Sequence, residues 1–187
     1  MKLKQMLTAA TVILSLLTGS AFAAGSKAEK QAELRSATQK SVEKFYKADP
    51  KLQGEVKNAA GYAVFTTYGL SFVIGGAGGK GLAHDNKTGK DVFMAMAQAS
   101  AGPQIGLSES ETLIIFKSAK GMQQFVDKGW TIGTGGSLQV GAGGKSAGPA
   151  EGAVQNADAS YFTLTKNGIG VGIAADGTKF WKDDELN

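Results

Sequence analysis

The first apolar pattern along the chain repeats with a helical period. Between residues 26 and 48, apolar side chains recur at three- and four-residue intervals, and lysine, arginine and glutamate fill the other positions. This spacing predicts an amphipathic helix, which Asp49-Pro50 ends. Asp49 and Pro50 are also suited to the N-cap and first position of a second, short helix, which we expect to end near Gly61.

From Tyr62 onward the apolar pattern changes to short runs separated by turn signals. The expected strands cover residues 62–67, 70–74, 91–97, 112–116, 130–140, 161–165, 169–174 and 179–181. Asn167-Gly168 is a two-residue hairpin signal. One helix interrupts the strands, because Ser118 can act as its N-cap and Gly129 can end it. This order predicts an α+β fold, with N-terminal helices followed by a mostly antiparallel sheet that carries one inserted helix.

Glycine is unusually frequent, at 27 of 187 residues, and many glycines fall inside the expected strands. In residues 169–173 and 132–140 glycine tends to alternate with bulkier side chains. Glycine weakens a strand but lets another backbone approach closely or lets the sheet bend. We therefore expect a tightly curved sheet or a small barrel.

A glycine signature occurs twice, in residues 75–81 and 141–145. Residues 76–81 fit the dinucleotide-binding pattern G-x-G-x-x-G, but that site needs a helix after the last glycine, and a strand and turn are expected here. We interpret the glycines as structural, with a lysine in each glycine loop. The structural set is Gly75, Gly76, Gly78, Gly79, Gly81, Gly141, Gly143 and Gly144, and the two lysines are Lys80 and Lys145.

The N-terminus has the features of a secretory signal peptide. Lys2 and Lys4 precede a mostly apolar stretch over residues 6–18, and Ala21-Phe22-Ala23 is a cleavage signal. An apolar stretch of about 13 residues is too short to span the hydrocarbon core of a bilayer. We expect cleavage after Ala23 and a periplasmic protein. The expected organisation is a signal peptide (1–23), an amphipathic helix (24–49) and one domain (50–187).

Charge and composition narrow the possible functions. The formal net charge of +4 falls to +2 once Lys2 and Lys4 are removed, which is too small to indicate nucleic-acid binding. The chain has no cysteine, and its one histidine, His84, is expected at a strand end beside a turn. Asp183-Asp184-Glu185 is expected to be a solvated tail, with calcium binding as a remote alternative. No nucleophile elbow is present, so a hydrolase remains only a third hypothesis.

The segment from about Leu52 to Trp181 resembles the SYLF domain, a lipid-binding module also found in yeast actin-patch proteins. The matching segments are 60–65, 69–82, the Gly102-Pro103-Gln104-Ile105-Gly106 run, 113–126, and 141–148 with Tyr161. No single motif is specific, whereas their order and spacing together are. The resemblance implies a binding module without enzymatic activity or cofactor, which acts through basic residues and an N-terminal amphipathic helix.

For an exported protein, the transferable part of this resemblance is an anionic phospholipid at a membrane surface, and actin is not an expected partner. The candidate lipid-binding residues are Lys27, Lys30, Arg35, Lys40, Lys44, Lys47, Lys80 and Lys145. The helix has two possible positions, on a membrane surface or packed against the sheet, and its weak, alanine-rich stripe favours packing. The alternative function is an envelope scaffold that binds another protein through a strand edge or an apolar patch.

Overall fold

The computed structural model describes residues 25–67, 76–99, 110–132, 138–140, 146–147, 158–165, 168–171 and 177–187. Its helices are α1 (Lys27–Ala48), α2 (Lys51–Asn58) and α3 (Ala119–Lys128). Its strands are β1 (Gly61–Thr67), β2 (Gly76–Asp85), β3 (Asp91–Ala99), β4 (Glu111–Phe116), β5 (Trp130–Ile132), β6 (Leu138–Val140), β7 (Ser146–Ala147), β8 (Ala159–Thr165), β9 (Gly168–Val171) and β10 (Thr178–Lys182). The predicted signal peptide, the predicted strand at 70–74 and Lys145 lie outside the described residues.

Local sequence signals determine where the helices begin and end. The Ser26 side chain accepts a hydrogen bond from the Glu29 amide, and the Glu29 carboxylate accepts one from the Ser26 amide, which forms a capping box at the start of α1. At α3, Ser118 Oγ accepts from the Gly121 amide at 3.0 Å, and Gly129 ends the helix with φ near 70°. The predicted helices at 26–48 and after Ser118 are therefore confirmed.

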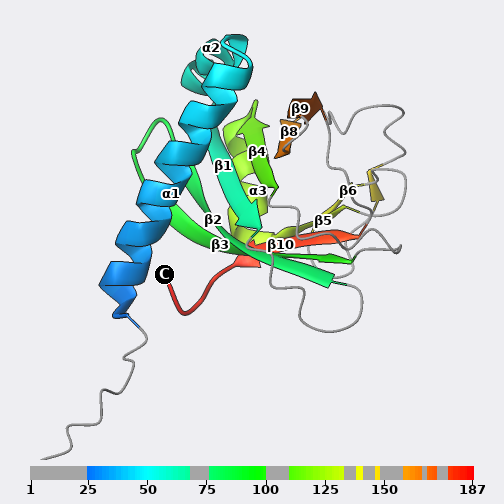
Figure 1. Cartoon of the computed structure of the whole chain (residues 1–187). Coiled ribbons are helices and arrows are strands. Elements are labelled where there is room, and N and C mark those ends of the chain that lie inside the picture. The colour runs from blue at the N-terminus through cyan, green and yellow to red at the C-terminus, as the bar shows by residue number, and fades with distance from the viewer. Residues whose placement is uncertain are drawn as a thin grey trace, which may run out of the picture.

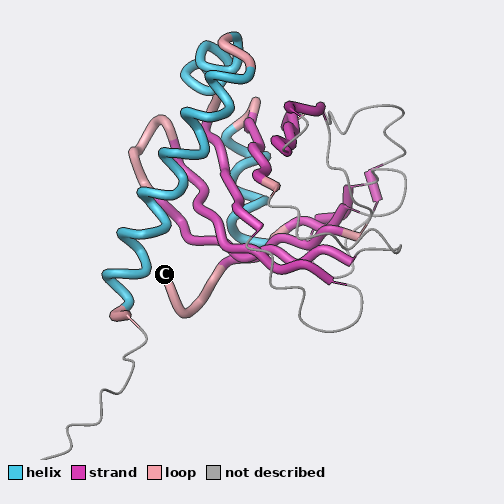
Figure 2. The backbone as a smooth tube through the Cα atoms, in the orientation of Figure 1, coloured by secondary structure: helices cyan, strands magenta, loops and turns pink. Residues whose placement is uncertain are grey.

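The described strands form one ten-stranded sheet in the order β7-β6-β5-β10-β3-β2-β1-β4-β8-β9. The strand pairs are antiparallel throughout this part of the chain. The sheet curls into an open half-barrel, with α1 along one face (Figures 1 and 2). The predicted α+β fold with a mostly antiparallel, curved sheet is confirmed.

The inner face of the sheet holds the larger core cluster. Alternate residues of β1, β3, β4 and β8 point inward, and α3 adds Met122 and Phe125 to them. Phe125 lies within 5.0–6.2 Å, centroid to centroid, of four aromatic rings. These rings belong to Phe65, Phe116, Trp130 and Phe180. The inserted helix therefore fills the hollow of the half-barrel.

The outer face is covered by α1 and α2. Val42 and Phe45 of α1 and Leu52 and Val56 of α2 pack on outward-facing residues of β1, β4 and β8. Farther along α1, Leu34 packs with Leu82, Phe93 and Leu186. The apolar stripe of α1 is therefore buried against the sheet, as the packed-helix alternative requires.

Two predicted elements differ from the structure. Residues 130–140 are not one strand, because β5 and β6 pair with each other as antiparallel neighbours. Residues 76–81 do not form a loop, because they are the first half of β2 and pair with both β1 and β3. The glycine-rich sequence therefore predicted one strand too long, at residues 130–140, and left residues 76–81 out of another.

Candidate functional site

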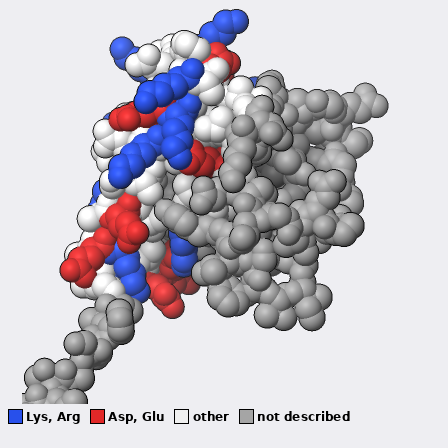
Figure 3. All heavy atoms as spheres, viewed as in Figure 1, with Lys and Arg blue, Asp and Glu red and all other residues white. Residues whose placement is uncertain are grey.

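Helix α1 presents a stripe of exposed lysines along one flank, beside its buried residues. Lys40, Lys44 and Lys47 are spaced at four and three residues, so they lie above one another on the same helical face. All three are exposed, and the basic side chains gather over one half of α1 in Figure 3. We call Lys40, Lys44 and Lys47 the lysine stripe.

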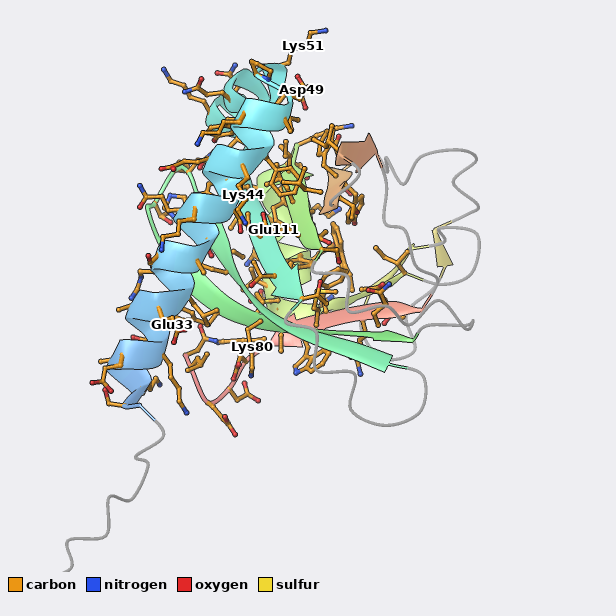
Figure 4. All side chains as sticks on the ribbon, in the orientation of Figure 1. Glu33, Lys44, Asp49, Lys51, Lys80 and Glu111 are labelled. Carbon is orange, nitrogen blue, oxygen red and sulfur yellow. The ribbon has the colours of Figure 1, made fainter. Side chains whose placement is uncertain are left out.

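Members of the lysine stripe differ in their partners. Lys44 Nζ forms an ion pair with Glu111 Oε1 at the start of β4, and Figure 4 shows the two side chains facing each other. Within the described ranges, Lys40 and Lys47 make no ion pair. Their ammonium groups are therefore available to an anionic ligand.

Beneath α1, a row of directly paired residues crosses the outer face of the sheet. The register places Trp181 opposite Ala95, Ala95 opposite Lys80, Lys80 opposite Thr66, and Thr66 opposite Glu111. Directly paired residues share a face of the sheet. Lys80 and Glu111 therefore lie on the same outer surface that α1 covers.

Lys80 is held by the C-terminal segment, which corrects the prediction of a solvated tail. Its Nζ pairs with Asp183 Oδ2, and the Asp183 side chain is only 4% exposed. Asp184 and Glu185 are exposed as predicted. The Asp183 carboxylate is buried because it has both this partner and the Glu185 amide at 3.1 Å. Lys80 therefore has a structural role, although half of its side chain remains exposed.

The same segment also fastens the first half of α1. The Leu186 carbonyl accepts from Gln31 Nε2 at 2.6 Å, and a main-chain oxygen of Asn187 accepts from Lys27 Nζ. The Asn187 side chain bonds in turn to the main chain of Phe93 in β3, at 2.8 and 3.0 Å. Lys27 is therefore part of this attachment.

Arg35 lies apart from the lysine stripe. Its Nε donates to Asp91 Oδ2 at 2.8 Å, and its guanidinium carbon lies 5.0 Å from the centre of the Phe93 ring. His84 Nδ1 lies 2.8 Å from the other Asp91 oxygen. Burial raises the pKa of the Asp91 carboxyl, but the hydrogen bonds from His84 and Arg35 outweigh it and hold the pKa below its usual value. This cluster joins α1 to the β2–β3 hairpin.

Two grooves run along the same side of α1 and share Glu33 and Ala37. The first, of about 370 Å³, lies between α1 and the adjoining ends of β1 and β4, and Lys40 and Lys44 line it. The second, of about 280 Å³, lies between α1, β2 and the C-terminal segment, and Lys30 and Lys80 line it. The structure therefore places Lys30, Lys40, Lys44 and Lys80 along one continuous side of the helix.

Two glycines of β2, Gly79 and Gly81, have a structural role. A Cβ on Gly79 would lie 2.8 Å from the carbonyl oxygen of Thr66, and a Cβ on Gly81 would overlap Val64 and the ring of Phe65. Gly78 is exposed and has room for a side chain. Gly76 begins β2, and Gly75, Gly141, Gly143 and Gly144 lie outside the described residues.

Sequence reasoning missed the polar floor beneath α1. Thr66, Thr67, Ser110 and Glu111 line the first groove with Ser41 of the helix, yet none of them belongs to a motif. One signal was available, because Thr38 and Ser41 occupy positions of the buried helical stripe. In the part of the chain that the structure describes, no group of three or more acidic or histidine side chains could hold a metal ion.

Comparisons with known proteins give one family model and several relatives. The family model described as Ysc84, Las17-binding protein actin regulator, matches residues 97–187. Beta cell expansion factor A of Aeromonas veronii is 27% identical over 143 residues, which cover 76% of this chain and 53% of that protein. Protein YSC84 and LAS seventeen-binding protein 3 of Saccharomyces cerevisiae are each 29% identical over 139 residues, which cover 71% of this chain and 30% of theirs. The chain thus spans about half of the bacterial relative and about a third of the yeast ones.

The fold and the site define a binding domain, in which a basic helix and two grooves lie on the outside of a curled antiparallel sheet. The family model matches the C-terminal part of the chain, and the relatives match about three quarters of it. These matches support the resemblance to the SYLF domain, which the yeast relative Ysc84 also represents.

Proposed function

We propose that this protein is a non-catalytic, periplasmic lipid-binding protein that associates with anionic phospholipid membranes. The observation that carries the proposal is the exposed lysine stripe on the outer side of α1, with Lys40 and Lys47 unpaired within the described residues. Ammonium groups near a membrane surface contribute about 1 kcal/mol each through attraction to anionic lipids. The stripe therefore supplies a few kcal/mol of binding free energy, which salt weakens.

Binding in this arrangement is a surface contact. Val42 and Phe45 face the sheet, so α1 in its docked position offers lysines to the membrane and keeps its apolar residues in the core. This agrees with the favoured packed position of the helix and not with the alternative, in which the helix lies on a membrane surface with its apolar stripe in the acyl boundary. Within the described residues, no helix has both the length and the apolar character needed to cross a bilayer.

The proposed location rests on residues 1–23. Their basic start, apolar stretch and A-x-A signal support export and cleavage after Ala23. Mass spectrometry of the protein from an osmotic-shock extract tests this, because cleavage gives a chain that begins at Ala24. Recovery of the uncleaved chain in the cytoplasm would contradict it.

Membrane association is tested by co-sedimentation of the purified protein with vesicles. We expect the protein to pellet with vesicles rich in phosphatidylglycerol at low salt and to be released as the salt concentration is raised. It should not bind vesicles made of phosphatidylcholine alone. A protein that stays in the supernatant with anionic vesicles at low salt would contradict the proposal.

A second candidate is an envelope scaffold that binds another protein. The family model and LAS seventeen-binding protein 3 are named for Las17 binding, which favours a protein partner in that branch. The order of the described strands ends at β9, whose outer edge could accept a further strand. A stable protein partner in a pull-down, together with indifference to vesicles, would favour this function.

A further inference from the structure

The groove between α1 and the ends of β1 and β4 is lined by several residues with hydroxyl groups. Its volume is about 370 Å³, and it is lined by the hydroxyls of Ser36, Ser41, Thr66, Thr67 and Ser110. Thr67 and Ser110 are already joined, with 2.8 Å between their side-chain oxygens. The groove therefore has a polar floor that suits a ligand rich in hydrogen-bonding groups.

Glu111 supplies an unused acceptor at this floor. Its Oε1 accepts from Lys44, while its Oε2 is buried and has no hydrogen-bond partner among the described residues. The side chain is 14% exposed, so little of it reaches bulk solvent. A buried carboxylate oxygen without a donor is costly, and a ligand hydroxyl could supply that donor.

The helix side of the groove supplies the complementary charge. Lys40 lines it, is exposed, and has no ion-pair partner in the described ranges. Lys44 is engaged by Glu111 and keeps further donors, because an ammonium group has three. A ligand with a phosphate and neighbouring hydroxyls would place the phosphate at Lys40 and one hydroxyl at Glu111 Oε2.

We propose that this groove is a subsite for a polyol phosphate of the glycerophosphate class, in which Lys40 receives the phosphate and Glu111 Oε2 accepts from a hydroxyl. The inference rests on the proposed membrane function and adds headgroup selectivity to it. The same chemistry occurs in the headgroup of phosphatidylglycerol and in free glycerol 1-phosphate, so the experiment has an arm for each.

The lipid arm compares vesicles that contain phosphatidylglycerol with vesicles that contain equal amounts of phosphatidylmethanol, which has the same charge and no hydroxyl. We expect the wild type to bind the phosphatidylglycerol vesicles about tenfold more tightly, the effect of one hydrogen bond to a charged group. Glu111→Gln should reduce this preference, because an amide oxygen is a weaker acceptor than a carboxylate oxygen. The matched control is Glu55→Gln, on an exposed face of α2, which should retain it.

Ser41→Ala provides a second variant if Glu111→Gln does not fold, because alanine suits a helix interior and the change removes one lining hydroxyl. Like Glu111→Gln, it should reduce the preference for phosphatidylglycerol over phosphatidylmethanol vesicles. Equal binding of both vesicle types by the wild type would overturn the inference while leaving the proposed function in place.

The soluble arm titrates glycerol 1-phosphate into the ¹⁵N-labelled protein. We expect amide shifts at residues 36–44 and 110–111, and weaker binding in Glu111→Gln. If the protein bound neither vesicle type, the proposed function would fail, and this titration alone would decide the subsite. The absence of shifts would then overturn the inference as well.

Discussion

At the residue scale, Gly81 allows β1 and β2 to pack closely. Gly81 is paired with Phe65 in the ladder, and the ring of Phe65 occupies the space where a side chain at position 81 would lie. The ring also contacts Phe125 and Phe180 in the core. The glycine is therefore needed for the position of an aromatic ring at the centre of the molecule.

Gly81→Ala should lower the free energy of unfolding by about 2–3 kcal/mol, because Phe65 or the main chain must shift. The control is Gly54→Ala in α2, where nothing lies within 4 Å of the added methyl, and there we expect a gain of up to about 1 kcal/mol. Urea denaturation measures both. Equal effects of the two substitutions would contradict the close packing assigned to Gly81.

Asp91 should make stability depend on pH in the acid range. Its pKa is lowered in the folded state, since the hydrogen bonds from His84 and Arg35 outweigh the effect of burial. A lowered carboxyl pKa contributes stability that is present above the usual Asp pKa and is lost as pH falls through the folded value.

Asp91→Asn should therefore cost about 1 kcal/mol at neutral pH, and the difference from the wild type should shrink as the pH falls below about 4. Urea denaturation at a series of pH values measures this. The control is Asp127→Asn, on the exposed side of α3. A difference between Asp91→Asn and the wild type that stays constant with pH would contradict the role of Asp91.

At the element scale, α1 is attached by both apolar packing and polar contacts. Phe45 is fully buried between the sheet and α2, and Arg35, Lys44, Gln31 and Lys27 bond to strands or to the C-terminal segment. Deleting residues 26–48 would expose the apolar outer face of the sheet. Substitutions of single lysines therefore test membrane binding more cleanly than removal of the helix.

Phe45→Ala should lower the free energy of unfolding by about 3–5 kcal/mol, because it leaves a cavity under α1. Ala32→Ser, on the exposed side of the same helix, should change it by no more than about 0.5 kcal/mol. Thermal and urea denaturation both report these changes. A loss below about 1 kcal/mol for Phe45→Ala would show that α1 is not docked as described.

The elements that could be predicted from the sequence are those with local signals. Ser26, Ser118 and Gly129 mark helix ends through hydrogen bonds or backbone angles that the residues themselves favour. The strand over residues 76–81 could not be recognised, because glycine gives no apolar alternation and its pairing with β1 and β3 is long-range. The buried position of Asp183 depends on Lys80, more than a hundred residues earlier, for the same reason.

For the candidate site, the sequence indicated which lysines to consider, and the structure shows which of them are held in ion pairs. Helical spacing alone groups Lys40, Lys44 and Lys47, whereas only the fold shows that Arg35 and Lys80 are held by Asp91 and Asp183. The polar floor of the groove could not be predicted, because Thr66 and Glu111 meet Ser41 only after β1, β4 and α1 have packed.

At the scale of the whole molecule, the sheet separates the hydrophobic core from the surface that carries the candidate site. Its inner face and α3 form the core, and its outer face supports α1, which carries the lysine stripe and borders both grooves. A membrane that meets the outer side of α1 would therefore contact the stripe while the core stays intact. Lys117 and Lys120 flank the start of α3, and neither lines the two grooves along α1.

The most direct test of this account is vesicle co-sedimentation of two charge-matched double variants. Lys40→Glu/Lys47→Glu removes the unpaired lysines of the stripe, and Lys117→Glu/Lys120→Glu makes the same change in net charge at α3. At low salt we expect the first variant to bind phosphatidylglycerol vesicles at least about 30-fold more weakly than the wild type, and the second to bind nearly as well. Equal losses in the two variants, or no loss in the first, would contradict a membrane-binding surface on α1.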